Sequence, residues 1–209
     1  MLMDQSIAEL FELAFDEEDI IVELADEELL FTNQPAGNLQ LSSGQILAGD
    51  PSRATDALQL TTTVPTGEFP VEVAIAEFAE GEEIIGYFRI KFSDNDPQHW
   101  ESATYVGDNA NASTLVESGI FILADANVLS DLPTIDGEER EVIMNKLSDA
   151  LDVTYEDDRA WAQIVLESGN LVACSSGDGA GAYSTYIGRD EQGKICRLLV
   201  DFALFEEDE

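Results

Sequence analysis

Two neighbouring segments in which apolar and polar residues alternate constrain the fold of this chain most strongly. They run from Phe69 to Glu77 and from Ile84 to Phe92, and the short stretch AEGEE lies between them. A period of two residues is typical of strands with one buried face, and a short connection containing glycine joins such strands into an antiparallel hairpin. In this hairpin we expect Arg89 and Lys91 to lie near Glu72 as cross-strand charge pairs.

Much of the remaining chain also has the pattern of short strands separated by turn residues. Further strands are predicted at residues 44–51, 100–106, 116–123, 161–166, 171–174, 183–187 and 195–204. The sequence QPAGN at 34–38 predicts a loop, because proline and glycine interrupt regular structure. Residues 16–31 alternate acidic clusters with apolar runs and fit either a helix or a strand. No internal repeat is recognised in the sequence.

Two segments have the spacing of helices instead. The first is Asp4–Phe15, whose apolar stripe comprises Ile7, Leu10, Phe11 and Ala14, with Glu9 and Glu12 expected away from it. The second is Asp136–Leu151, with Asp136 as the N-cap and a buried stripe of Val142, Ile143, Leu147 and Leu151. Together the elements predict an α+β protein, mainly an antiparallel β-sheet or sandwich with a few helices.

The charge of the chain limits its partners. There are 44 acidic residues against nine lysines and arginines, which gives a formal net charge of −35. Such a field repels phosphate backbones and anionic lipid headgroups, so we expect neither a nucleic acid nor a membrane as partner. A charged macromolecular partner is expected to be a basic protein. Two interpretations of the charge are open. One is mimicry of a nucleic acid, in which carboxylates imitate phosphates and occupy a basic protein. The other is a surface adapted to a salty environment, in which acidic residues replace lysine throughout, and the spread of the charge along the chain favours it.

The cysteines, the single histidine and the N-terminal residues indicate which metal sites and which cellular location to expect. Cys174 and Cys196 do not form a CxxC motif, and His99 is the only histidine, so a Cys/His zinc site is not expected. The first fifteen residues contain three acidic side chains and no basic one, unlike a secretory signal. We therefore expect a cytoplasmic protein with two free thiols.

The stretch SSGDGAGAYSTYIGRDEQGK, from Ser175 to Lys194, is the most unusual part of the sequence. Its glycines permit backbone conformations that other residues resist. It differs from a phosphate-binding loop, because a strand is predicted after it where such a loop precedes a helix. We expect Gly177, Asp178 and Gly179 to form a tight turn in which the Asp178 carboxylate accepts backbone hydrogen bonds. A loop that holds a ligand is the alternative.

Several stretches, in this order and spacing, give the chain a family resemblance. They are SGQILAGDP from Ser43, VPTGEFPVEVAIAEF from Val64, WESAT from Trp100, ESGIFILAD from Glu117, SGDGAGAYSTYIGRDEQGK from Ser176 and LLVDF from Leu198. The chain resembles the bacterial family known as domain of unknown function 4241. The resemblance implies a single α+β domain without an established activity, and it assigns no catalytic residue. We divide the chain into an acidic N-terminal segment packing on the domain (1–42), the domain itself (43–205) and an acidic tail (206–209).

Five residues are candidates for binding. Asp50, Asp125 and Asp178 stand at predicted strand ends or beside glycines, where grouped carboxylates would attract Mg²⁺ or Ca²⁺. For Asp50 and Asp178 the structural alternative is that each caps a turn through its own side chain. His99 is a candidate general base and Tyr183 closes the glycine-rich loop. The spacing fits no established metal site or cofactor motif, and we predict neither.

Three functions compete. The first is a non-catalytic binding protein, similar to an immunity protein or an inhibitor, with a cationic partner. The second is an enzyme, acting on a small molecule or dependent on a metal, that uses the Gly177–Tyr183 loop together with Asp50 or Asp125. The third is a structural domain whose charge is an adaptation to salt. The oligomeric state and the catalytic residues, if any exist, are left open by the sequence.

Overall fold

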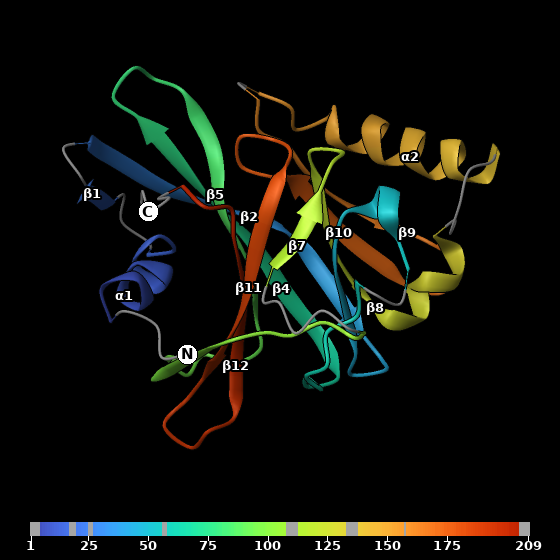
Figure 1. Cartoon of the computed structure of the whole chain (residues 1–209), viewed down its shortest axis with the longest axis horizontal. Helices are drawn as coiled ribbons and strands as arrows, with labels where there is room; N and C mark the ends of the chain where they lie inside the picture. Colours follow the sequence, from blue (N-terminus) through green and yellow to red (C-terminus); the bar gives the residue numbers. More distant parts are fainter. Residues whose placement is uncertain are drawn as a thin grey trace.

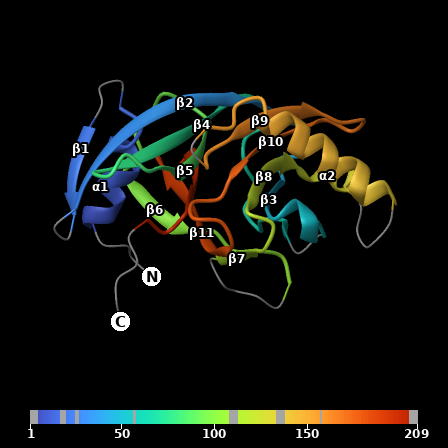
Figure 2. The ribbon, with the colours of Figure 1, turned by 90° about the horizontal axis from the view of Figure 1, so that it is seen from above.

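A computed structural model describes residues 5–16, 20–24, 27–55, 58–107, 113–132, 138–156 and 158–204 of the chain. Two antiparallel sheets pack face to face, and one α-helix covers the outer face of each. Helix α1 (Gln5–Leu13) and helix α2 (Glu138–Leu151) lie on opposite sides of the molecule (Figure 1, Figure 2). The predicted α+β class with a mainly antiparallel sheet is confirmed.

The larger sheet has eight strands. Its order is β1 (Ile20–Leu24), β2 (Glu27–Leu41), β4 (Gly67–Phe78), β5 (Glu83–Lys91), β12 (Ile195–Asp201), β11 (Gly181–Arg189) and β6 (His99–Ser102), with β7 (Ser113–Val116) also paired to β11. The smaller sheet has the order β3 (Ile46–Gly49), β8 (Ile120–Asp125), β10 (Asn170–Ser175) and β9 (Trp161–Val165). The strand pairs in the described part of the chain are all antiparallel, as the short connections predicted.

Three apolar clusters hold the four layers together. The main core lies between the sheets, where Phe88 and Leu198 of the larger sheet share a cluster with Leu123 of the smaller one. A second cluster joins the smaller sheet to α2, and a third joins the larger sheet to α1. Central strands therefore bury both faces: in β12 Leu198 faces the core, and Leu199 belongs to the cluster under α1. This explains why β12 has an almost continuous apolar sequence.

The predicted hairpin is confirmed, together with one of its charge pairs. Strands β4 and β5 pair so that Glu72 lies opposite Arg89, and their side chains form an ion pair of 2.7 Å. Lys91 does not join this pair. It bonds Asp94 at 2.9 Å in the turn that follows β5.

The predicted loop at 34–38 is wrong, because these residues lie inside β2. Pro35 pairs with Glu72 and Gly37 with Val71, so Ala36 is an extra residue in a β-bulge. A bulge accommodates proline and glycine without ending the strand, and the φ angle of +141° at Gly37 is accessible mainly to glycine. Helix and strand were both open for residues 16–31. Of these, residues 20–24 form strand β1 and residues 27–31 form the first part of β2.

The segment predicted as one strand at 116–123 is divided between the two sheets. Strand β7 ends at Val116 in the larger sheet and β8 begins at Ile120 in the smaller one. A turn at 117–119 carries the chain from one layer to the other. The apolar pattern on both sides of this turn concealed it.

Both predicted helices exist, with differences in their faces. Leu10, Phe11 and Ala14 are buried, whereas the predicted cap Asp4 lies outside the described residues, as does Asp136 for α2. In α2, Leu147 and Leu151 are buried as predicted, and Ile143 is partly buried against the same cluster. Val142 is 64% exposed, so its assignment to the buried stripe is wrong.

The domain boundary predicted after residue 42 falls just beyond β2, which pairs with β4 along its length.

Candidate functional site

Asp50 and Asp125, two of the predicted binding residues, serve the fold as turn caps. Asp50 is fully buried at the end of β3. Its carboxylate accepts hydrogen bonds from the backbone N–H groups of Ser52 (2.7 Å), Glu117 (2.7 Å) and Ser118 (2.9 Å), and from the Ser118 hydroxyl (2.7 Å). Burial alone would raise the pKa of Asp50, but these hydrogen bonds outweigh it and the pKa is lowered.

Asp125 has the same role at the end of β8. It is 1% exposed and accepts from the N–H groups of Ser42 (2.7 Å), Ser43 (2.8 Å) and Asn127 (2.9 Å), and from the Ser43 hydroxyl (2.9 Å). A carboxylate has about four acceptor positions. In Asp50 and Asp125 these are occupied by donors of the same chain, which leaves no oxygen lone pair directed at a ligand. The structural alternative for Asp50 therefore fits, and we base no binding proposal on either residue.

A short internal repeat explains this pair and contradicts the expectation of no repeat. SGQILAGD begins at Ser43 and SGIFILAD at Ser118, so an aspartate follows each Ser-Gly at the same distance. The two copies form the antiparallel neighbours β3 and β8, and each aspartate caps the Ser-Gly turn of the other. A third copy, SGNLVACS from Ser168, forms β10, and its Ser168 N–H donates to Asp131 at 2.6 Å. The spacing in the sequence was the signal that could have identified this device.

Asp178 and Tyr183, two more of the predicted residues, lie together in a surface groove of about 470 Å³. Three segments form it: the end of the β4–β5 hairpin, the turn before β11 and the segment that follows β12. Figure 1 shows the hairpin (green) and this turn (orange) at the same end of the larger sheet. The lining residues are Phe78, Glu82, Ile84, Asp178, Ala180, Gly181, Ala182, Tyr183, Phe202, Ala203 and Leu204.

The turn that carries Asp178 is held firmly by its neighbours. Gly177 and Gly179 have φ angles of +48° and +106°, as the glycine pattern predicted. A Cβ added to Gly177 would lie 2.9 Å from the Cβ of Phe202, so the turn packs directly on the segment after β12. The Tyr183 hydroxyl lies 3.0 Å from the carbonyl oxygen of Ser176 and 2.9 Å from that of Gly179. The conformation of the turn is therefore fixed from both sides.

The Asp178 carboxylate does not cap this turn, which corrects the predicted role. Asp178 is exposed, and no described group donates a hydrogen bond to its side chain. The turn is closed instead by the Gly179 N–H, which donates to the Ser176 carbonyl at 2.7 Å, and by the Ser176 hydroxyl, which donates to the Gly179 carbonyl at 2.7 Å. Glu82, which reaches the groove from the turn of the β4–β5 hairpin, is exposed as well, and within the described chain no partner is found for its carboxylate. The groove thus has two carboxylates that the fold does not use.

The five predicted residues do not form one site. The turn capped by Asp50 touches the turn of Asp178, because Ser176 N–H donates to the Gly119 carbonyl at 3.1 Å. Asp50 therefore supports the groove indirectly. Asp125 lies at the other end of the β3–β8 pair, and His99 is exposed at the start of β6 and does not line the groove. Glu82 and the segment after β12 were not predicted, since only the fold places them beside Asp178.

The polar side chains that line the groove are those of Asp178, Glu82 and Tyr183. Its lining contains a tyrosine whose hydroxyl faces two carbonyl oxygens, and it includes no cysteine, serine, histidine or lysine. The thiols of Cys174 and Cys196 are buried elsewhere, and burial raises the pKa of Cys174 well above its usual value. In the described ranges no three His, Cys, Asp or Glu side chains are grouped so that they could hold a metal ion.

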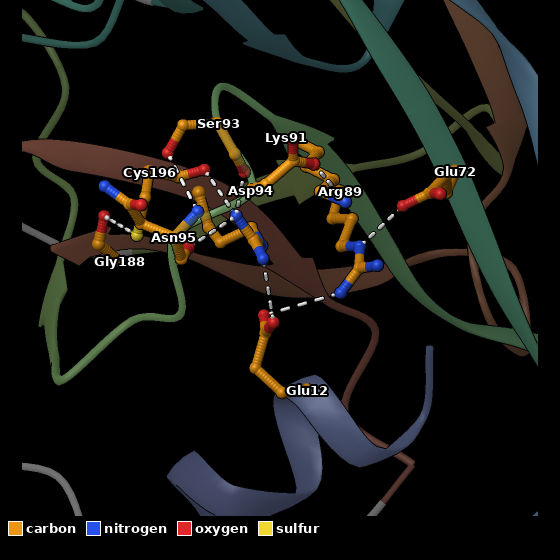
Figure 3. A network of polar contacts seen from close by, with 10 residues as sticks. Glu12, Glu72, Arg89, Lys91, Ser93, Asp94, Asn95, Gly188 and Cys196 are labelled. Carbon is orange, nitrogen blue, oxygen red and sulfur yellow. Dashed lines mark hydrogen bonds and ion pairs between the residues drawn. The ribbon is translucent and has the colours of Figure 1, made fainter. Parts of the chain in front are cut away.

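A second polar cluster, which the sequence did not reveal, lies beneath α1 (Figure 3). Glu12 bonds Arg89 at 3.4 Å and Arg197 at 3.2 Å, and Arg89 also pairs with Glu72. Glu12 was expected away from the packed face of the helix, but it points at the sheet. Arg89 and Arg197 are 6% and 3% exposed, so this cluster is a structural connection between α1 and the sheet.

Comparison with known proteins identifies the family. A family model described as "Protein of unknown function (DUF4241)" matches residues 39–200. Searches of the curated proteins and of the solved structures gave no significant match. In the described part of the chain, no helix is long and apolar enough to cross a membrane. The matched residues include every strand of the smaller sheet and the turn that carries Asp178, and the chain belongs to the DUF4241 family.

Proposed function

We propose that the protein is a non-catalytic binding protein of the bacterial cytoplasm whose partner is a basic protein, in the manner of an immunity protein or an inhibitor. The observation that carries this proposal is the way in which the chain uses its few positive charges. It has nine lysines and arginines against 44 acidic residues. The surface that a partner meets depends on where those nine are placed.

Most of the arginines are paired with glutamates of the same chain. These pairs are Arg53 with Glu117, Arg89 with Glu12 and Glu72, Arg159 with Glu83 and Glu156, Arg189 with Glu101, and Arg197 with Glu12. These five guanidinium groups are therefore neutralised locally, and the remaining carboxylates give the surface its field. Such a field accelerates encounter with a basic partner and disfavours acidic competitors.

The condition of the candidate residues also supports binding over catalysis. An enzyme of the predicted kind would use Asp50 or Asp125, but the hydrogen bonds of both carboxylates are occupied within the fold. The groove next to Asp178 has carboxylates and apolar side chains, which suit recognition of a cationic group.

A test must separate specific binding from simple attraction between opposite charges. The probe is a twelve-residue peptide of alternating arginine and serine, measured by isothermal titration calorimetry at 50 and 500 mM NaCl. We expect saturable binding with a fixed stoichiometry and weaker affinity at high salt. A matched peptide with glutamate in place of arginine should not bind.

The control is a polyglutamate chain of 35 residues, which has the same net charge without a folded surface. If the protein binds the arginine peptide no more tightly than polyglutamate does, and without a fixed stoichiometry, the proposal is wrong. The acidic surface would then be an adaptation to salt.

A further inference from the structure

We infer that the groove formed by the β4–β5 hairpin, the turn before β11 and the segment after β12 binds an arginine side chain of the basic partner, with its guanidinium group between Asp178 and Glu82. This inference rests on the proposed function and assigns the place of contact within it. The lining of the groove has an apolar part and a negatively charged part.

The floor of the groove suits the aliphatic part of a long side chain. Phe78, Ile84, Phe202 and Leu204 contribute apolar surface to the lining. The rings of Tyr183 and Phe202 meet edge to face with their centroids 5.0 Å apart, which makes that part of the wall compact. A lysine or arginine stem packs on such a surface while its charged end stays at the polar rim.

The rim suits the charged end. Asp178 and Glu82 approach the groove from two different segments, and both carboxylates are exposed. A guanidinium group has five N–H donors in a planar fork and can bond two carboxylates at once, whereas an ammonium group acts as a point charge. Two exposed carboxylates lining one groove with apolar residues therefore favour arginine over lysine.

The groove is formed before any partner arrives. The Ser176 and Tyr183 hydroxyls and the packing of Gly177 on Phe202 fix the turn under Asp178. The segment after β12 is fixed as well, because Phe202 N–H donates to the Gly86 carbonyl at 3.0 Å. Leu204 covers Gly86 so closely that a Cβ there would lie 2.3 Å from it. A preformed site loses less entropy on binding, so modest contacts yield more affinity.

A second acidic hollow, formed by described residues, differs from the groove. It is lined by the 94–98 and 190–192 loops. Asp94 there is paired with Lys91, and Asp190 accepts from the Asn95 amide and from the N–H groups of Gln192 and Lys194. Asp94 and Asp190 therefore maintain loop structure, and the remaining carboxylates of this hollow, Asp96 and Glu191, have no apolar side chain beside them in its lining.

The experiment compares two double variants of the full chain that have the same net charge. Asp178→Asn with Glu82→Gln neutralises the groove. Glu141→Gln with Asp149→Asn neutralises two exposed carboxylates on α2, at the other side of the molecule. None of these four carboxylates has a hydrogen-bond or ion-pair partner among the described residues, so both variants should have the melting temperature of the wild-type protein. Calorimetry with the arginine–serine peptide gives the affinities.

Relative to the wild-type protein, we expect the groove variant to bind the peptide at least about tenfold more weakly, and the α2 variant no more than about twofold more weakly. A tenfold loss corresponds to about 1.4 kcal/mol, which is the size of one charge-assisted contact. The matching lysine peptide should bind the wild-type protein more weakly than the arginine peptide does. Equal weakening in the two variants would overturn the groove assignment and leave a basic partner in place. Failure of the wild-type protein to bind with fixed stoichiometry would instead overturn the proposed function.

Discussion

Replacing Glu12 by glutamine is expected to destabilise the protein far more than its exposure suggests. Glu12 retains 29% of its side-chain exposure, but the two guanidinium groups that it bonds are buried, with side-chain exposures of 7% for Arg89 and 3% for Arg197. Glutamine keeps the size of the side chain and removes its charge. Both arginines would then lose a shared counter-ion inside the α1 interface (Figure 3).

The magnitude follows from what each arginine keeps. Arg89 retains Glu72 at 2.7 Å. Arg197 retains only the carbonyl oxygens of Ser93, Asn95 and Cys196 among its described partners, and its Nε is buried without a partner. Removing one member of a buried ion pair costs about 3–5 kcal/mol. The long distances and the partial exposure of Glu12 reduce this value, so we expect a loss of about 2–3 kcal/mol in the free energy of unfolding.

The assay is urea unfolding followed by tryptophan fluorescence. Trp100 reports on α1 directly, because its ring lies 5.3 Å from that of Phe11. The control is Glu9→Gln, which makes the same charge change on the exposed side of α1 and should alter the free energy by less than about 0.5 kcal/mol. If Glu12→Gln and Glu9→Gln behave alike, the cluster contributes no net stability and the reasoning is refuted.

Three further predictions concern charge and the groove turn. Raising NaCl or KCl from 20 mM to 1 M should raise the melting temperature, because screening weakens repulsion within a chain of net charge −35; an unchanged value in both salts contradicts this. Burial, opposed by a hydrogen bond from Ala203 N–H, raises the pKa of Asp201 to about 6. Protonation of Asp201 therefore favours the folded state, and its stabilising effect is lost as the pH rises through about 6. Asp201→Asn should stabilise the protein by about 1–3 kcal/mol at pH 7.5 and by little at pH 4 in urea titrations, and equal effects at both pH values would refute it. Gly177→Ala should cost about 2–4 kcal/mol, because alanine adds backbone strain at φ +48° and a contact with Phe202; a melt like that of the wild-type protein would show that the turn is loose.

The sheets could be predicted from the sequence wherever one face of a strand is polar. Alternation located β4 and β5 and even the Glu72–Arg89 pair, because cross-strand neighbours follow directly from a hairpin register. The break between β7 and β8 was concealed, since both strands bury apolar side chains and the chain changes sheet between them. The bulge at Ala36 was missed for another reason. Proline and glycine usually indicate the end of a strand, but β2 continues through them because it pairs with β4 on both sides of the bulge.

The groove could be predicted only in part. Asp178 and Tyr183 stood out because the glycines around them are unusual, and that signal is local in the sequence. Glu82 and Leu204 come from two other segments, and neither has a distinctive sequence context. Their proximity to Asp178 depends on the pairing of β12 with both β5 and β11, which no single sequence pattern reports.

The aspartates of this chain show why a carboxylate at a strand end is a poor sign of a site by itself. Asp50 and Asp125 had the position expected of metal ligands, yet each is saturated by N–H and hydroxyl donors of a neighbouring turn. Asp178 stands beside glycines as well, but serine and tyrosine hydroxyls hold its turn. The carboxylates differ in whether they already accept hydrogen bonds within the fold. A carboxylate that does so cannot also bind a ligand without a loss of stability. Several of the 44 acidic residues meet this criterion, and Asp178 and Glu82 are the pair to test first because they also line a groove with apolar side chains.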